Sequence, residues 1–224
     1  MGIHDGHRQR MKQRFLRHGL DNFDDVNALE LLLYYALPRQ DTNPLAHRLL
    51  ERFGSLSAVL EASEAQLCAV EGVGENAAAL LRLIPAVSQR YMLDKTRENK
   101  VIDSATAAGR YFLPRFMYER EEVLYALFLN ARNGVLDCRE LSRGHISAVE
   151  IPVRRLVETA LELHAASVIL AHNHPSGVVT PSREDEKATR NIREALALVD
   201  VELMDHIVVS GCEYASMREC ALLR

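Results

Sequence analysis

The chain has 224 residues, 48% of them hydrophobic and 26% charged, enough apolar side chains for one large folded domain or two small ones. With only 11 glycines and 7 prolines, the composition excludes a disordered, collagen-like or low-complexity protein. The 27 basic and 31 acidic residues give a formal net charge of -4, so the chain as a whole does not attract nucleic acid.

No run of about 18 apolar residues occurs, and no hydrophobic segment follows the charges near the N-terminus. We therefore expect neither a membrane span nor secretion. The four cysteines stand singly, with no Cys-x-x-Cys pair among them. We expect reduced thiols and a cytoplasmic protein; the cysteines are Cys68, Cys138, Cys212 and Cys220.

Basic side chains crowd the first twenty residues, where Asp5 is the only acidic residue. Such a run is typical of a solvated helix face, and a local contact with nucleic acid is the alternative. The residues concerned are Arg8, Arg10, Lys12, Arg14 and Arg17.

From residue 27 to residue 90, apolar residues recur at steps of three and four, which predicts helices nearly throughout. The helix predicted over 43–53 has Pro44 just inside its start and Gly54 just past its end, as helix termini prefer. Charges gather between Tyr91 and Asp103 as the apolar period lapses. We therefore predict an all-α domain over 1–100 and a second domain over 101–224.

The second domain alternates strands and helices, which predicts an α/β (α+β) domain built on a mixed sheet. An Asn-Gly turn at Asn133 separates its first two strands. The predicted helices are 104–116, 153–164 and 182–198, and the predicted strands are 123–129, 135–141, 167–171, 201–209 and a short piece around Tyr214.

The segment 70–77 has the sequence Val-Glu-Gly-Val-Gly-Glu-Asn-Ala and lies between helical stretches. It resembles the helix-hairpin-helix element of DNA-repair proteins, in which backbone N–H groups, here of Gly72, Val73 and Gly74, meet a phosphate. Glu71 and Glu75 oppose such binding, and a hairpin that only packs helices is an equal alternative. We expect weak DNA binding at most, shared with the basic N-terminus.

The segment 171–185 carries the residues best suited to chemistry. His172 and His174 are two apart at a predicted strand end, so their imidazoles point the same way and can bind one ion. Zn²⁺ prefers such ligands, and a catalytic zinc has three protein ligands and an open position. Asp185, in the first turn of the next helix, is the candidate third ligand. Alternatively, Ser182 and Asp185 form only a capping box at that helix.

The run His172-Asn-His-Pro-Ser-Gly, with Ser182 and Asp185 following, resembles the JAMM motif of MPN metalloproteases, and the surrounding segments resemble the RadC family. The resemblance implies an MPN-like domain over 101–224 with His172, His174 and Asp185 as zinc ligands. It also implies Glu122 as general base and Ser182 as an oxyanion-stabilising residue. Glu119 and Glu121 leave the choice of Glu122 open.

The family resemblance implies a catalytic role. We therefore predict a zinc-dependent metallopeptidase or isopeptidase whose glutamate activates zinc-bound water for attack on an amide of an unidentified protein or peptide. The alternative is a DNA-associated repair or recombination accessory protein that binds without catalysis. Asn173 stands where many JAMM proteases have Ser or Thr, although RadC-like sequences commonly carry Asn. We interpret Asp205 and His206 as a buried structural pair, with support of a zinc ligand as the alternative.

Overall fold

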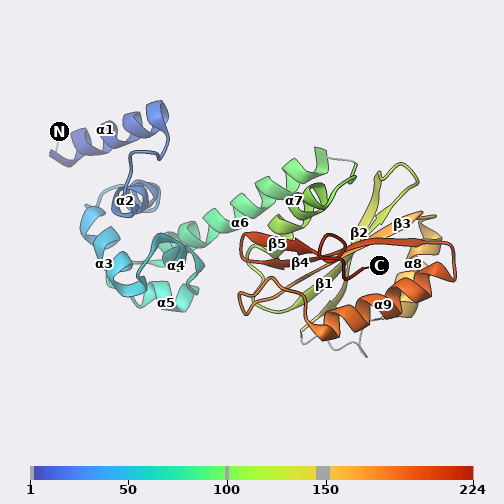
Figure 1. Cartoon of the computed structure of the whole chain (residues 1–224). Coiled ribbons are helices and arrows are strands. Elements are labelled where there is room, and N and C mark those ends of the chain that lie inside the picture. Colours follow the sequence, from blue (N-terminus) through green and yellow to red (C-terminus); the bar gives the residue numbers. More distant parts are fainter. Residues whose placement is uncertain (1–2, 99–100, 145–151, 224) are drawn as a thin grey trace. The chain divides into compact units, whose positions relative to one another are not determined.

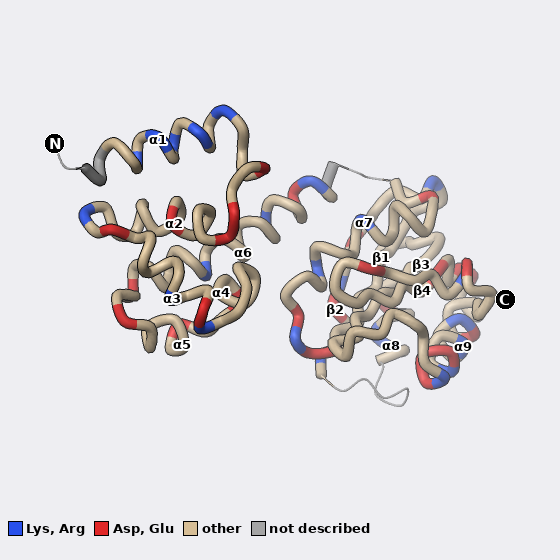
Figure 2. Tube along the Cα trace, turned by 60° about the vertical axis from the view of Figure 1, so that its left-hand side comes forward, with Lys and Arg blue, Asp and Glu red and all other residues tan. Residues whose placement is uncertain are grey.

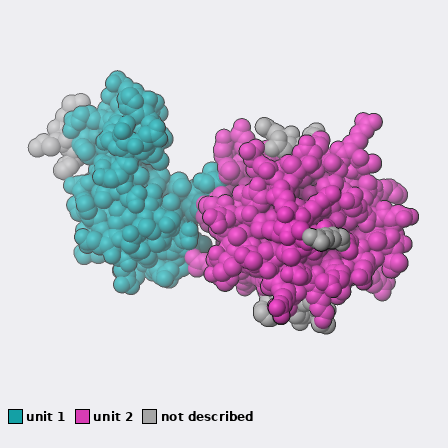
Figure 3. Space-filling model, in the orientation of Figure 1, with its two compact units in different colours: residues 1–88 teal, residues 89–224 magenta. Residues whose placement is uncertain are grey.

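The computed structural model describes residues 3–98, 101–144 and 152–223 of the chain (Figure 1). Contacts divide the chain into two compact units, residues 1–88 and 89–224, coloured separately in Figure 3. This division lies inside helix α6 (Glu75–Glu98). The boundary predicted from the sequence, between residues 100 and 101, falls just after the end of that helix.

The N-terminal unit is helical, and its helix ends follow local sequence signals. Asp24 accepts a hydrogen bond from the Asn27 amide and so caps the start of α2. Gly54 ends α3 with a φ of 88°, a left-handed conformation that glycine adopts without strain. The first five helices are α1 (Ile3–His18), α2 (Asp25–Ala36), α3 (Asn43–Phe53), α4 (Leu56–Glu61) and α5 (Glu64–Cys68).

Fully buried leucines from α2, α3, α5 and α6 form the core of this unit, among them Leu29, Leu33, Leu49 and Leu81. Their spacing produces the period that predicted helices here. Helix α6 continues beyond the point where that period lapses, and Met92, Leu93 and Lys95 in this stretch are good helix formers.

The C-terminal unit contains a five-stranded sheet in the order β2-β1-β3-β4-β5. Only β3 and β4 are parallel, and α9 forms the crossover between them. The predicted mixed sheet and the α+β class are confirmed. The elements are α7 (Ala105–Phe116), β1 (Val123–Leu129), β2 (Val135–Arg143), α8 (Val153–Glu162), β3 (Ser167–Asn173), α9 (Arg183–Ala197), β4 (Glu202–Ser210) and β5 (Glu213–Ser216).

Helices cover both faces of this sheet. Leu170 of β3 belongs to the apolar cluster that includes residues of α8 and α9, whereas Ile169 belongs to the cluster with α7. Every residue of β3 is buried, which explains why residues 168–171 form a continuous apolar run. Because side chains alternate along a strand, His172 lies on the same face as Leu170 and is directed toward α9.

None of the helices in the described part of the chain combines the length and the hydropathy that a membrane span requires. All four cysteines have free thiols.

Candidate metal centre

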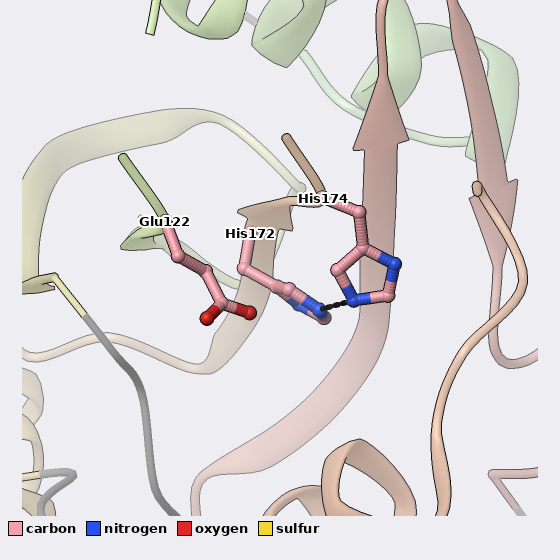
Figure 4. Close-up of side chains that lie close together, drawn as sticks. All are labelled: Glu122, His172 and His174. Carbon is pink, nitrogen blue, oxygen red and sulfur yellow. Dashed lines mark hydrogen bonds between the residues drawn. The ribbon is translucent and has the colours of Figure 1, made fainter. Parts of the chain in front are cut away.

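The imidazoles of His172 and His174 converge at the end of β3, as the sequence predicts (Figure 4). Their Nε2 atoms lie 2.9 Å apart. The Nδ1 atom of His174 lies 2.7 Å from the carbonyl oxygen of Val178, in the loop that follows the strand. Because a carbonyl can only accept, Nδ1 of His174 carries a proton and donates it to this oxygen.

Asp185 completes this cluster from the first turn of α9. Its Oδ1 lies 3.2 Å from Nε2 of His172, and its Oδ2 lies 3.4 Å from Nε2 of His174. Burial by itself raises the pKa of Asp185, but its contacts with the two histidines outweigh burial and hold that pKa far below the usual value. The same carboxylate raises the pKa of His174. Two imidazole nitrogens and a carboxylate in mutual contact form a donor set that suits a divalent metal ion.

The capping box and the cluster share the Asp185 carboxylate. Its Oδ2 accepts hydrogen bonds from the backbone amide and the hydroxyl of Ser182, both at 2.7 Å, while the Asp185 amide donates to that hydroxyl. The two sequence interpretations of Ser182 and Asp185 are therefore compatible, because capping orients the carboxylate toward the histidines. The hydroxyl of Ser182 contacts Asp185, and its role toward an oxyanion remains a prediction.

Glu122 lies directly before β1, and a carboxylate oxygen of this residue lies within 4.8 Å of ring nitrogens of His172 and His174 (Figure 4). The pairing of Leu124 with His172 in the β1–β3 ladder brings Glu122 to this strand end. Glu119 instead forms a bidentate ion pair with Arg143, at 2.7 and 3.1 Å.

Asn173, the residue between the two histidines, holds the backbone on both sides of Glu122. Its Nδ2 donates to the carbonyl of Glu121 at 2.9 Å, and its Oδ1 accepts from the amide of Val123 at 2.8 Å. Asn173 is only 4% exposed. The sequence places this residue correctly between two candidate ligands but gives no signal for its contact with a segment 50 residues away.

Behind the cluster, Nδ1 of His172 lies 2.8 Å from Nε2 of His206. Burial lowers the pKa of His206, and the nearby His172 lowers it further. Nδ1 of His206 contacts the Thr189 hydroxyl at 2.6 Å. Asp205 instead accepts hydrogen bonds from Ser216 and from backbone amides. Of Asp205 and His206, only His206 thus contacts a candidate metal ligand. Nothing in the sequence indicated that Thr189 would contact this histidine.

The two regions expected to contact DNA lie at opposite ends of the N-terminal unit, with α1 at one end and the turn after α5 at the other (Figure 2). Arg8 donates to the carbonyls of Leu37 and Pro38 and so satisfies the end of α2. Gly72 has a φ of 94°, and the exposed Arg48 of α3 donates to the Glu71 carbonyl beside it. Local sequence reading misses this cation because it comes from another helix.

A mixed sheet with a histidine pair at one strand end, an aspartate from the next helix and a glutamate before the first strand places the C-terminal unit among JAB/MPN-type domains. Residues 102–222 match the model of the RadC-like JAB domain, and the chain belongs to this family.

Relatives of similar length support this assignment. The chain is 34% identical to a UPF0758 protein of Fusobacterium nucleatum subsp. nucleatum over 97% of both chains. It is 38% identical to a UPF0758 protein of Paraburkholderia phytofirmans over 88% of this chain and 76% of that relative. A UPF0758 protein of Burkholderia thailandensis is 39% identical over 89% of this chain and 76% of the relative.

Proposed function

We propose that this protein is a zinc-dependent hydrolase of amide or isopeptide bonds in a protein or peptide substrate. The observation that carries the proposal is the convergence of His172, His174 and Asp185 beside the Glu122 carboxylate. The first three residues would hold Zn²⁺. When bound, the ion would supply a Lewis acid that polarises an amide carbonyl and lowers the pKa of water.

The chain itself supplies the proton transfers. The Glu122 carboxylate accepts a proton from the attacking water as the new C–O bond forms. It then returns that proton to the amine nitrogen as the C–N bond breaks. Asn173 holds the backbone on both sides of Glu122 during these transfers, and the Ser182 hydroxyl is the candidate donor to the oxyanion.

Metal analysis combined with Glu122→Gln tests this proposal. We expect close to one zinc per chain, lost in His172→Ala, and retained in Glu122→Gln because the amide has nearly the same shape as the carboxyl group. A peptide library containing α-peptide and lysine isopeptide bonds, read by mass spectrometry, should show cleavage that Glu122→Gln slows by about 10²- to 10⁴-fold. Glu121→Gln is the matched control and should leave the rate unchanged.

Three results would contradict the proposal. Purified protein that takes up no zinc on titration would exclude the metal. Loss of zinc in Glu122→Gln would make Glu122 a ligand and not the base, and full activity of that variant would move the base elsewhere, first to Glu121.

DNA binding by the N-terminal unit is our second candidate function. Exposed Arg10, Arg14 and Arg17 on α1 and Arg48 beside the Gly72 turn support it, because each can reach a phosphate. Helix α1 and the Gly72 turn lie at the two ends of the unit, so a nucleic acid would contact each of them separately. We therefore propose weak, salt-sensitive binding.

A further inference from the structure

A chain of three short hydrogen bonds lies behind His172 on the side away from the metal cluster. The Thr189 hydroxyl donates to the backbone carbonyl of Asp185 at 2.6 Å and contacts Nδ1 of His206, also at 2.6 Å. Nε2 of His206 then contacts Nδ1 of His172 at 2.8 Å. The three side chains are buried, with exposures of 2 to 3%, so water does not compete for these bonds.

Counting protons along this chain fixes the direction of every bond. A hydroxyl has one proton, and Thr189 gives it to the Asp185 carbonyl, which can only accept. The Thr189 oxygen therefore accepts from Nδ1–H of His206. The Met217 sulfur, 3.6 Å from the same oxygen, is a weak acceptor and does not compete with a carbonyl at 2.6 Å.

A neutral imidazole has one N–H, so His206 accepts at Nε2 from Nδ1–H of His172. With its proton on Nδ1, His172 presents an Nε2 lone pair to the space it shares with His174 and Asp185.

We infer that Thr189 and His206 are positioning residues that lock the tautomer of His172 so that its Nε2 lone pair faces the metal. The inference rests on the proposed metal site. In the other tautomer, an Nε2–H would point at that site and block coordination. Because the chain starts at the carbonyl of Asp185, the first turn of α9 both supplies one ligand and sets the protonation of another.

Thr189→Val tests the lock because valine keeps the shape of threonine and removes the hydroxyl. His206 then loses the acceptor for Nδ1–H and is free to carry its proton on Nε2, which drives the proton of His172 to Nε2. We expect zinc affinity, measured by competition with a chromogenic chelator, to fall by about 10- to 100-fold. Thr189→Ser should stay within about threefold of the wild type, because its hydroxyl restores the chain.

Three further variants separate the loss of this hydrogen-bond chain from general damage to the core. Thr159→Val makes the same substitution at another buried threonine of the unit, 4% exposed in α8, and should bind zinc like the wild type. His206→Gln retains one acceptor and one donor group and should preserve most of the affinity, whereas His206→Leu should lose it. Equal losses in His206→Gln and His206→Leu would overturn the inference.

Nitrogen-15 NMR of the metal-free protein reads the tautomers without any metal or substrate. We expect His172 and His206 protonated at Nδ1 in the wild type and at Nε2 in Thr189→Val. Protonation of His172 at Nε2 in the wild type, or Thr189→Val with wild-type zinc affinity, would overturn the inference. A wild-type protein that shows the predicted tautomers but binds no zinc would instead contradict the proposed function.

Discussion

Replacing Asn173 should reveal how firmly the chain holds its candidate base. Asn173→Leu preserves the approximate size of the side chain and removes both hydrogen bonds to the segment around Glu122. Val123 is fully buried, so its amide finds no water and costs about 1–3 kcal/mol when left unpaired. The Glu121 carbonyl belongs to an exposed residue and can be rehydrated, so its loss adds only about 0.5–1 kcal/mol.

The expected total is a loss of about 1.5–4 kcal/mol in the free energy of unfolding of the C-terminal unit. For a chain of this size, that corresponds to a fall of about 3–16 °C in melting temperature, measured by differential scanning calorimetry. Asn173→Asp keeps an acceptor for the Val123 amide and should lose less. Zinc content should persist in both variants, because no ligand atom is removed.

An unchanged melting temperature in Asn173→Leu would refute the reasoning, since it would mean that the two bonds contribute no net stability. Equal losses in Asn173→Leu and Asn173→Asp would refute the assignment of most of the cost to the Val123 amide. Complete loss of zinc in Asn173→Leu would show that the strand end, and not only the segment around Glu122, depends on this side chain.

Removing the metal with a chelator should lower the melting temperature of the wild type, and zinc at 100 times its Kd should restore about 2.7 kcal/mol; His172→Ala should respond to neither treatment. Ser182→Ala should cost about 1 kcal/mol of stability through the lost cap and slow turnover by about 10²- to 10³-fold. If the fold-loss in rate is no larger than the fold-loss in bound zinc, the role of Ser182 is limited to orienting Asp185. Fluorescence anisotropy with a short DNA duplex should show weak binding that falls steeply with salt and is reduced by Arg10→Glu and Arg48→Glu. Tight binding at physiological salt that both charge reversals leave unchanged would contradict these contacts.

Sequence patterns predicted the sheet and most of its flanking helices because burial imposes regular periods. The strand predicted over 123–129 matches β1, and the helix predicted over 43–53 matches α3. The strand predicted over 167–171 extends to Asn173 in the structure, because its last two residues are polar and the apolar pattern stops before them. Polar residues at a strand end thus hide the true length of the strand from an argument based on hydrophobicity.

Residues that act across the chain could not be found in the same way. Asn173 contacts residues 121 and 123, and Arg48 reaches the Gly72 turn from α3; neither contact follows from local spacing. Thr189 lies within α9, where threonine carries no distinct signal. These contacts depend on how the elements pack, and packing is the step that periodicity alone does not determine.

The cap of α9 illustrates why the local interpretation of a motif and its functional interpretation need not compete. A capping box requires a carboxylate at the third position of a helix, directed back toward its start. At Asp185 that direction is also the direction of His172 and His174, because β3 ends beside the first turn of α9. The backbone amide of Ser182 fixes one carboxylate oxygen and leaves the other directed at His172. Helix capping therefore orients the candidate ligand in advance, and a side chain held in this way would lose less conformational freedom on binding a metal.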